Sequence, residues 1–489
     1  MKKMREMLSE KPWLGWVLFF ATLAAVFLIA LFASTVVERR SEAVLALQVV
    51  REIPRWEPRN EVWGENFPRQ YESYRRTADT AFRSEHGGSA ERDYLSENPR
   101  LVVLWAGYSF SKDYHQGRGH FHAVTDIRQT LRTGPATPGT CWTCKSTDVP
   151  RLIDGMGAAE FYRTPWMELG SRVTHPIGCQ DCHDPATLRL RITRPALIEA
   201  LNGAGVAEDP GHQEMRSLVC AQCHAEYYFR GDGDHLTFPW GHGITVEAME
   251  AYYDATEFAD WTHALSRAPM LKSQHPDYEL YRTGVHASRG VSCADCHMPY
   301  RSEGGVKFTD HHVQSPLNNI ANSCQVCHRE SEDRLRRDVV ERQDRVLQLR
   351  TLVEEALVRA HLEARAAREA GASEDEMAPV LRLIRHAQWR WDWVASANSL
   401  GFHSPVEAPR VLGTAIQKAQ EARVLLAALF GRHGVVPPPL PDLSTKERAQ
   451  AFIGLDMEAA REAKPDFLRG AAAGWRDGPP EGDKPERPR

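Results

Sequence analysis

The hydrophobic pattern divides the chain into three parts, and the first is an uninterrupted apolar segment. Four basic residues within the first eleven precede an uncharged, mostly apolar run from Trp13 to Val37, which is long enough to cross a bilayer as a helix. The apolar stretch of a cleaved signal peptide is usually shorter, and no clear small-residue cleavage site precedes Glu38. We therefore expect residues 1–40 to be a membrane anchor or an uncleaved signal, with a cleaved signal as the alternative. Each of these exports the chain from residue 40 onward.

The second part of the chain lacks long periodic segments. Residues 41–60 are rich in charge and contain Pro54 and Pro58, which is typical of an exposed stalk. From 61 to 330, glycine and proline are scattered and regular apolar spacing is short. Because few long helices or strands are expected there, a packed interior needs some other filling.

Helical periodicity begins after residue 330. Residues 331–370 place apolar side chains at helical spacing and end at Gly371, which predicts one long helix. Ser373 and Glu376 then match a capping box in front of a second helix that is predicted to end near Ala397.

The helical pattern continues almost to the C-terminus. A third helix is predicted over 406–431, and Ser444 with Glu447 indicates a fourth. We expect 331–470 to be a helical region that either covers the core or forms a partner interface. Residues 471–489 are rich in proline, glycine and charge, and are predicted to be disordered.

Composition changes this picture mainly through cysteine and histidine. A chain of 489 residues is too long for one small core, and its net charge of −5 gives no electrostatic case for a nucleic-acid partner. The ten cysteines, however, form five Cys-x-x-Cys pairs, and the chain has 21 histidines. The pairs are Cys141/Cys144, Cys179/Cys182, Cys220/Cys223, Cys293/Cys296 and Cys324/Cys327.

Three kinds of chemistry compete for these pairs. Structural zinc needs two pairs for each metal, and disulfides seldom use this spacing. Neither explains why histidine directly follows four of the five pairs. Cys-x-x-Cys-His is the signature of covalent c-type haem attachment, in which the histidine binds the iron. The predicted proximal ligands are His183, His224, His297 and His328.

The first pair departs from this pattern. In Cys141-Trp142-Thr143-Cys144, the next residue is Lys145 where the others have histidine. A lysine amine binds iron only as the neutral base, so burial and the metal must lower its pKa. A decayed haem site or a plain redox pair is the alternative.

This combination of motifs resembles the catalytic subunit of cytochrome c nitrite reductase, the pentahaem ammonia-forming enzyme, from about Val102 to about His403. The resemblance implies a mainly α, multihaem cytochrome c fold. Its pentahaem catalytic core, loop-rich and packed with haem, would occupy 61–330, and long helices would follow. It also implies five c-type haems and calcium, and six-electron reduction of nitrite to ammonium at the lysine-ligated haem. Four haems with histidine on both faces would supply the electrons.

The resemblance also implies a set of residues around that haem. Arg132, Tyr227 and His275 match its arginine, tyrosine and histidine, which together with Lys145 would form the catalytic site. An anionic substrate needs positive charge and proton donors, although each of these residues is unremarkable alone. Only eight residues separate Arg132 from Cys141. This connection looks shorter than is usual in the family.

A calcium site and the distal iron ligands follow from the same resemblance. The calcium ligands would be the side chains of Glu226 and Gln274 and the backbone carbonyls of Tyr227 and Lys272, an all-oxygen set that suits calcium. Ordinary polar loop residues are the alternative. The implied distal ligands are His311 for the haem of His183, His120 for that of His224, His403 for that of His297 and His286 for that of His328. His312 makes the first of these ambiguous by one position.

Two other functions compete with this one. A multihaem electron-transfer cytochrome would explain the haems and the anchor but not Lys145. The other alternative is a related reductase of hydroxylamine or sulfite. The resemblance implies electron supply from a quinol-oxidising membrane multihaem cytochrome or a soluble multihaem carrier. It also implies a homodimer joined through the segments 331–370 and 374–397. We expect a periplasmic protein that its N-terminal segment anchors to the inner membrane.

Overall fold

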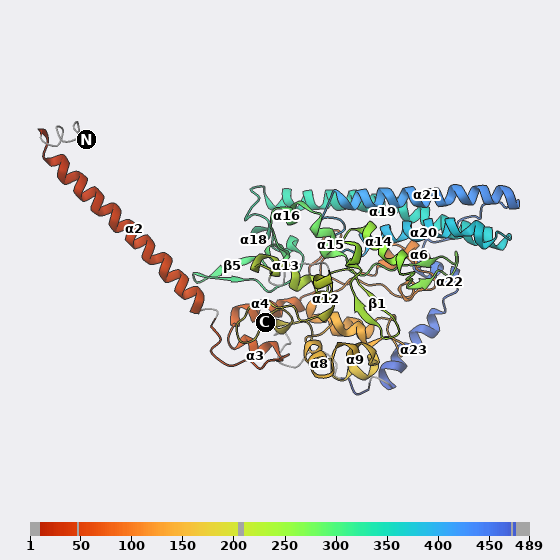
Figure 1. The fold of residues 1–489 in the computed structure, drawn as a ribbon, viewed down its shortest axis with the longest axis horizontal. Coiled ribbons are helices and arrows are strands. Elements are labelled where there is room, and N and C mark those ends of the chain that lie inside the picture. Colours follow the sequence, from red (N-terminus) through yellow and green to blue (C-terminus); the bar gives the residue numbers. More distant parts are fainter. Residues whose placement is uncertain (1–9, 46–47, 204–209, 471–472, 476–489) are drawn as a thin grey trace.

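The computed structural model describes residues 10–45, 48–203, 210–470 and 473–475, with only the backbone described for 39–45. Helix α2 (Trp13–Leu45) stands apart from the body, and the long C-terminal helices run along one side of it (Figure 1). Strands within these residues form only three two-stranded antiparallel sheets. The prediction of a mainly α fold is therefore confirmed.

The N-terminal apolar run forms a single helix. Trp13–Glu38 has a mean hydropathy of 2.6 and buries none of its most apolar window in the body. Helix α2 continues beyond the predicted end to Leu45. A helix of this length and composition fits either a signal or an anchor.

Three long helices match the periodic segments of the C-terminal region. They are α19 (Glu332–Glu369), α20 (Glu374–Ala395) and α21 (Glu407–His433), and they pack on one another. The predicted capping box at Ser373 and Glu376 is present. Helix α21 ends at Gly434, whose φ of 65° is left-handed and therefore favours glycine.

The last helices differ from prediction in detail. Helix α22 (Lys446–Phe452) is capped by Thr445, whose hydroxyl accepts from the backbone of Arg448 at 3.3 Å. Ser444, the predicted cap, instead donates its backbone N–H to Asp442. Helix α23 (Met457–Gly470) follows. Of the segment 471–489 only 473–475 is described, and Trp475 packs against the body.

The core between these regions consists of short elements joined by loops. Its helices are α3 (Asn60–Gly64), α4 (Pro68–Arg75), α5 (Tyr94–Glu97), α6 (Arg100–Leu104), α7 (Ala123–Gln129), α8 (Val149–Met156), α9 (Ala158–Arg163), α10 (Trp166–Gly170), α11 (Cys179–Cys182), α12 (Pro195–Gly203), α13 (His212–Ala221), α14 (Val246–Ala255), α15 (Asp277–Arg282), α16 (Val285–Ser288), α17 (Cys293–His297) and α18 (Ile320–Ser323). Its strands are β1 (Tyr228–Arg230), β2 (His235–Thr237), β3 (Trp261–Thr262), β4 (Pro269–Met270), β5 (Tyr300–Glu303) and β6 (Val306–Thr309).

Part of the predicted stalk lies on this core. Ile53 is buried and packs with Trp63 and Phe67 in a small hydrophobic cluster. The backbone N–H groups of Val50 and Arg51 are both bonded to the side chain of Asn66. The segment that connects α2 to the body is therefore fixed to α3 and α4 from about residue 50 onward.

Candidate functional site

The core encloses one very large cavity. Its volume is 2830 Å³, whereas an ordinary ligand pocket has about 300–1,000 Å³. All ten cysteines line it as thiols. No group of three or more His, Cys, Asp or Glu residues in the described part of the chain is arranged to hold a metal ion by itself. The cavity thus suits several large apolar cofactors better than structural zinc or disulfides.

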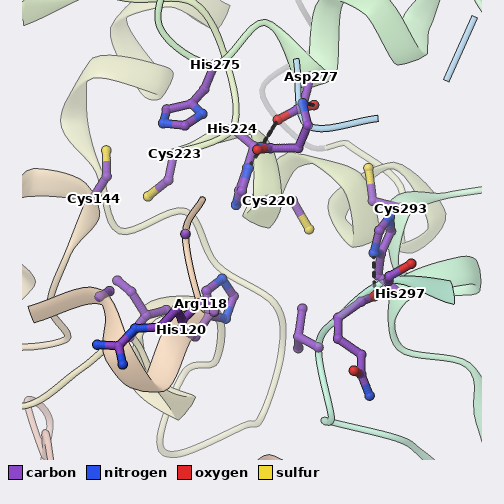
Figure 2. Close-up of a pocket in the computed structure, with 18 of the residues that line it drawn as sticks. Arg118, His120, Cys144, Cys220, Cys223, His224, His275, Asp277, Cys293 and His297 are labelled. Carbon is purple, nitrogen blue, oxygen red and sulfur yellow. Dashed lines mark hydrogen bonds and ion pairs between the residues drawn. The ribbon is translucent and has the colours of Figure 1, made fainter. Parts of the chain in front are cut away.

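Four pairs of histidine rings face each other across this cavity. The ring centroids are 6.1 Å apart for His183 and His311, 6.4 Å for His120 and His224, 6.2 Å for His297 and His403, and 6.3 Å for His286 and His328. A metal ion at about 2 Å from one nitrogen of each ring sets the centroids roughly 6 Å apart. The structure therefore brings together the four predicted pairs at a spacing that fits a haem iron between them. Figure 2 shows His120 and His224 turned toward the same space.

Backbone hydrogen bonds orient several of these rings. The Nδ1 atoms of His183, His297 and His311 lie 2.9, 2.8 and 2.8 Å from the carbonyl oxygens of Leu188, Gln314 and Thr309. An Nδ1–H that donates to a carbonyl leaves Nε2 with the free lone pair that binds a metal. His312, in contrast, lies against the side chain of Gln314.

Lys145 directly follows Cys141 and Cys144, the one Cys-x-x-Cys pair that is not followed by histidine. Residues Gly139–Cys144 form a 3₁₀ helix, and Lys145 caps it with its backbone N–H on the carbonyl of Trp142 at 2.9 Å. The indole of Trp142 is buried and stacks on Trp166 at 4.8 Å. The Lys145 side chain lines the cavity, and its amine has no hydrogen-bond or ion-pair partner among the described residues.

Arg132 presents its guanidinium to the same cavity. The group lies over the ring of Phe110 at 4.2 Å, and its Nε donates to the hydroxyl of Thr130 at 3.2 Å. That hydroxyl donates to Asp113 at 2.7 Å. The two terminal nitrogens of Arg132 have no hydrogen-bond partner in the part of the chain that the structure describes, so they are available to an anion. Phe110 and Asp113 were not identified from the sequence, because no local pattern connects them to Arg132.

Tyr227 and His275 add two groups that exchange protons. Burial raises the pKa of Tyr227 well above its ordinary value, with a contribution from Cys144. Burial lowers the pKa of His275 to about 3, and the positive charge of Lys145 contributes. The Nδ1 atom of His275 is buried without a partner among the described residues. Both groups are therefore neutral over the physiological pH range.

The residues predicted to bind calcium surround a buried carboxylate. Glu226 is fully buried, and it accepts from the hydroxyl of Ser273 at 3.0 Å and from the backbone of Gln274 at 2.7 Å. Burial raises the pKa of Glu226 well above its ordinary value. The amide of Gln274 lies 3.3 Å from the carbonyl oxygen of Lys272, and the two ends of an amide are interchangeable in such an assignment. The amine of Lys272 instead pairs with Asp392 at 2.9 Å. These oxygens fit a hard cation.

Asp277 is a further residue of the site that sequence reasoning missed. Its carboxylate lies 3.4 Å from Nδ1 of His224 and 3.8 Å from Nδ1 of His403 (Figure 2 shows the first contact). Asn398 fixes it with hydrogen bonds of 2.8 and 2.7 Å. Burial alone would raise the pKa of Asp277, but the contact with His224 brings it below its usual range. Its position two residues after His275 was the available signal.

Comparison with known proteins agrees with this geometry. The cytochrome c-552 of Bacteroides fragilis is 53% identical over 475 residues, which cover 95% of this chain and 96% of the relative. That of Porphyromonas gingivalis is 50% identical over 477 residues, with the same coverage. A solved structure of the catalytic subunit of cytochrome c nitrite reductase from Desulfovibrio desulfuricans, which has two calcium sites, superposes with a TM-score of 0.74 at 29% identity. It covers 89% of this chain and 98% of its own. The profile of the cytochrome c552 family matches residues 59–480, and the chain therefore belongs to that family.

Proposed function

We propose that this protein reduces nitrite to ammonium, using six electrons and eight protons for each nitrite. The observation that carries the proposal is the asymmetry of the cavity. Four Cys-x-x-Cys pairs end in a histidine that faces a second histidine, and the fifth ends in Lys145. Arg132, Tyr227 and His275 line the cavity with it. The Desulfovibrio relative is itself a nitrite reductase.

The ten cysteines would attach five c-type haems through thioether bonds. Lys145 would hold the iron of the haem at Cys141 and Cys144, and the four histidine pairs would hold the other irons. When bound, the lysine-ligated haem supplies an open coordination position and the electrons that reach it from the other four. Side chains of the protein would bind the substrate and donate the protons.

Each side chain near Lys145 has a distinct role in the proposed reaction. The free terminal nitrogens of Arg132 bind the anionic substrate through charge-assisted hydrogen bonds. The hydroxyl of Tyr227 and a ring N–H of His275 donate protons to the departing oxygens. Because the guanidinium packs over the ring of Phe110 and its Nε is bonded to Thr130, its donors are held in place before substrate arrives.

Calcium would bind to the oxygen atoms around Glu226. The side chains of Glu226 and Gln274 and the carbonyls of Tyr227 and Lys272 would be its ligands. Since Tyr227 and His275 directly follow Glu226 and Gln274 in the chain, the ion would fix both proton donors. Soaking the protein in a calcium chelator should therefore lower activity, and added calcium should restore it.

The proposed setting is the periplasmic side of the inner membrane. Helix α2 would anchor the protein there, because its apolar residues are exposed along its described length. A quinol-oxidising membrane multihaem cytochrome or a soluble multihaem carrier would supply electrons. A homodimer would form through α19 and α20, and Leu347 and Leu352 of α19 are exposed.

Ammonium yield from nitrite tests the proposed function directly. Holoprotein with all five haems is given nitrite and a chemically reduced dye, and ammonium is measured against nitrite consumed. We expect one ammonium for each nitrite. If fully loaded protein consumes no nitrite, the proposal is wrong and an electron-carrier function becomes the better explanation.

A further inference from the structure

We propose that the C-terminal part of the chain completes the substrate pocket, and that Lys464 is a positioning residue for Arg132. This inference rests on the proposed function and deepens it. We use the name C-terminal clasp for α22, α23 and Trp475. The clasp touches three separate segments of the pocket, and each contact is made by a residue that has no role in the chemistry described above.

Lys464 holds the turn that carries Arg132. Its side chain is only 8% exposed, although lysine is usually a surface residue. The amine donates to the carbonyl oxygen of Thr133 at 2.7 Å and to its hydroxyl oxygen at 2.9 Å. It has no ion-pair partner among the described residues, and it lines the same cavity as Arg132. A buried amine without a carboxylate is costly, and here two hydrogen bonds to Thr133 offset part of that cost.

Gln450 of α22 holds the segment beneath the guanidinium. Its amide donates to the carbonyl oxygens of Ser111 and Lys112, both at 3.1 Å. On either side of these two residues lie Phe110, which supports the guanidinium, and Asp113, which accepts from Thr130 and from the backbone of Leu131. The clasp therefore holds both the support of Arg132 and the turn that carries it.

Trp475 holds the segment that carries Lys145. Its indole meets Trp166 edge-on at 4.7 Å and Trp142 at 5.9 Å, and its Nε1 donates to the carbonyl of Met167 at 3.2 Å. The ring rests directly on Gly170, where any Cβ would overlap it. Trp142 belongs to the Cys-Trp-Thr-Cys-Lys element itself.

The short connection explains why such support is needed. Only eight residues join Arg132 to Cys141, and the turn within them has few contacts of its own. Gly134 and Thr137 exchange two hydrogen bonds within it, and the hydroxyl of Thr133 donates to the carbonyl oxygen of Ile127 at 2.7 Å. Among the residues that the structure describes, the guanidinium has a single hydrogen bond, to Thr130. Without Lys464 the carbonyl of Thr133 would lose its donor. The turn would then be held on this side mainly by the hydroxyl of Thr133, and Arg132 could shift away from the substrate.

The test compares holoprotein variants at two positions of α23. Lys464→Met removes the donor but keeps the length and apolar stem of the side chain, whereas Lys464→Gln keeps one neutral donor. Arg461→Met is the matched control, because Arg461 is an exposed cation on the same helix with no ion-pair partner among the described residues. Nitrite binding is measured by titrating oxidised holoprotein with sodium nitrite and following haem absorption. KM and kcat are measured with a reduced dye, and covalent haem content and helical circular dichroism are measured on every variant.

We expect Lys464→Met to raise both the Kd and the KM for nitrite about tenfold, because the variant loses one or two hydrogen bonds made by a charged group. The kcat should change less, Lys464→Gln should be intermediate, and Arg461→Met should behave as wild type. If Lys464→Met does not acquire five haems, Lys464→Gln decides in its place. Wild-type affinity in the Lys464 variants overturns the inference, and so does equal weakening by Arg461→Met.

The two proposals fail in different ways. Nitrite binding that depends on Lys464, together with a wild-type protein that yields no ammonium, overturns the proposed function and supports the positioning role. Ammonium formation by the wild type, with an unchanged KM in Lys464→Met, supports the proposed function and overturns the positioning role. A wild-type protein that neither binds nor consumes nitrite overturns both.

Discussion

Two buried histidines stack where the long helix α19 meets the core, and they make the stability of the protein sensitive to acid. The rings of His263 and His361 are 3.6 Å apart and nearly parallel. His361 lies 2.8 Å from the carbonyl oxygen of the Gln388 side chain and 2.9 Å from the hydroxyl of Ser266, and His263 lies 2.9 Å from the carbonyl of Val103. Each ring therefore donates one hydrogen bond from Nε2 and uses Nδ1 as an acceptor, which is the neutral form.

The size of the effect follows from the pKa values. Burial lowers the pKa of His361 from an ordinary 6.5 to about 4. Burial and the neighbouring His361 lower the pKa of His263 as well. Because the folded pKa lies below the unfolded one, the unfolded chain takes up the proton first as the pH falls. Stability is complete above the unfolded pKa and is lost as the pH falls toward the folded one. Between pH 7 and pH 5, His361 alone should remove about 2 kcal/mol from the free energy of unfolding.

The measurement is denaturant unfolding of holoprotein at pH 7 and pH 5, followed by far-ultraviolet circular dichroism. His361→Gln removes one titrating ring, and His242→Gln is the control because His242 is exposed. The loss of stability between the two pH values should be about 2 kcal/mol smaller in His361→Gln than in wild type, and unchanged in His242→Gln. Distant groups that titrate in all three proteins cancel in this comparison. His263 loses the neighbour that lowers its pKa, and this changes the comparison in the same direction. An equal loss in wild type and His361→Gln would refute the reasoning.

Three further predictions concern the haem site. Arg132→Gln should raise the KM for nitrite at least tenfold, because it removes charge-assisted bonds of about 1.5–3 kcal/mol; an unchanged KM in steady-state assays would exclude it from substrate binding. Asp277→Asn removes a negative charge beside His224 and His403, so spectroelectrochemistry should show two haems with potentials raised by about 65–130 mV. Potentials that all stay in place would count against that contact. His311→Gly should convert one low-spin haem to high spin in electron paramagnetic resonance, and His312→Gly should convert none. The reverse pattern would assign the ligand to His312.

The parts of the fold that were predictable from sequence are those determined by near neighbours. Helices α19 and α20 follow from apolar spacing, and the start of α20 follows from Ser373 and Glu376, which bond to each other within one turn. The start of α22 was predicted one residue early. Ser444 and Thr445 are both good caps, and the nearby Asp442 determines which of them is used by taking the backbone of Ser444.

The site shows the same division between local and distant determinants. The cysteine pairs and Lys145 are local motifs and were readable as such. The pairing of histidines required a family resemblance, because His120 and His224 meet only after the chain has folded. Lys464 carries no local pattern, and Asp277 carries only its place two residues after His275, since each acquires its role from residues far away in sequence.

The cavity of 2830 Å³ has a consequence for how the protein is made. Leaving buried space costs about 24 cal/mol for each Å³, whereas a folded domain has only about 5–15 kcal/mol of stability in total. Even if water offset most of that cost, a chain without porphyrins would not hold this shape. The polypeptide must therefore be open, with its five attachment motifs reachable, when the porphyrins are joined to it, and it becomes compact as each macrocycle is added. Chains that miss a porphyrin remain loose and are open to proteolysis. A chain must therefore carry its porphyrins before it can adopt this compact fold.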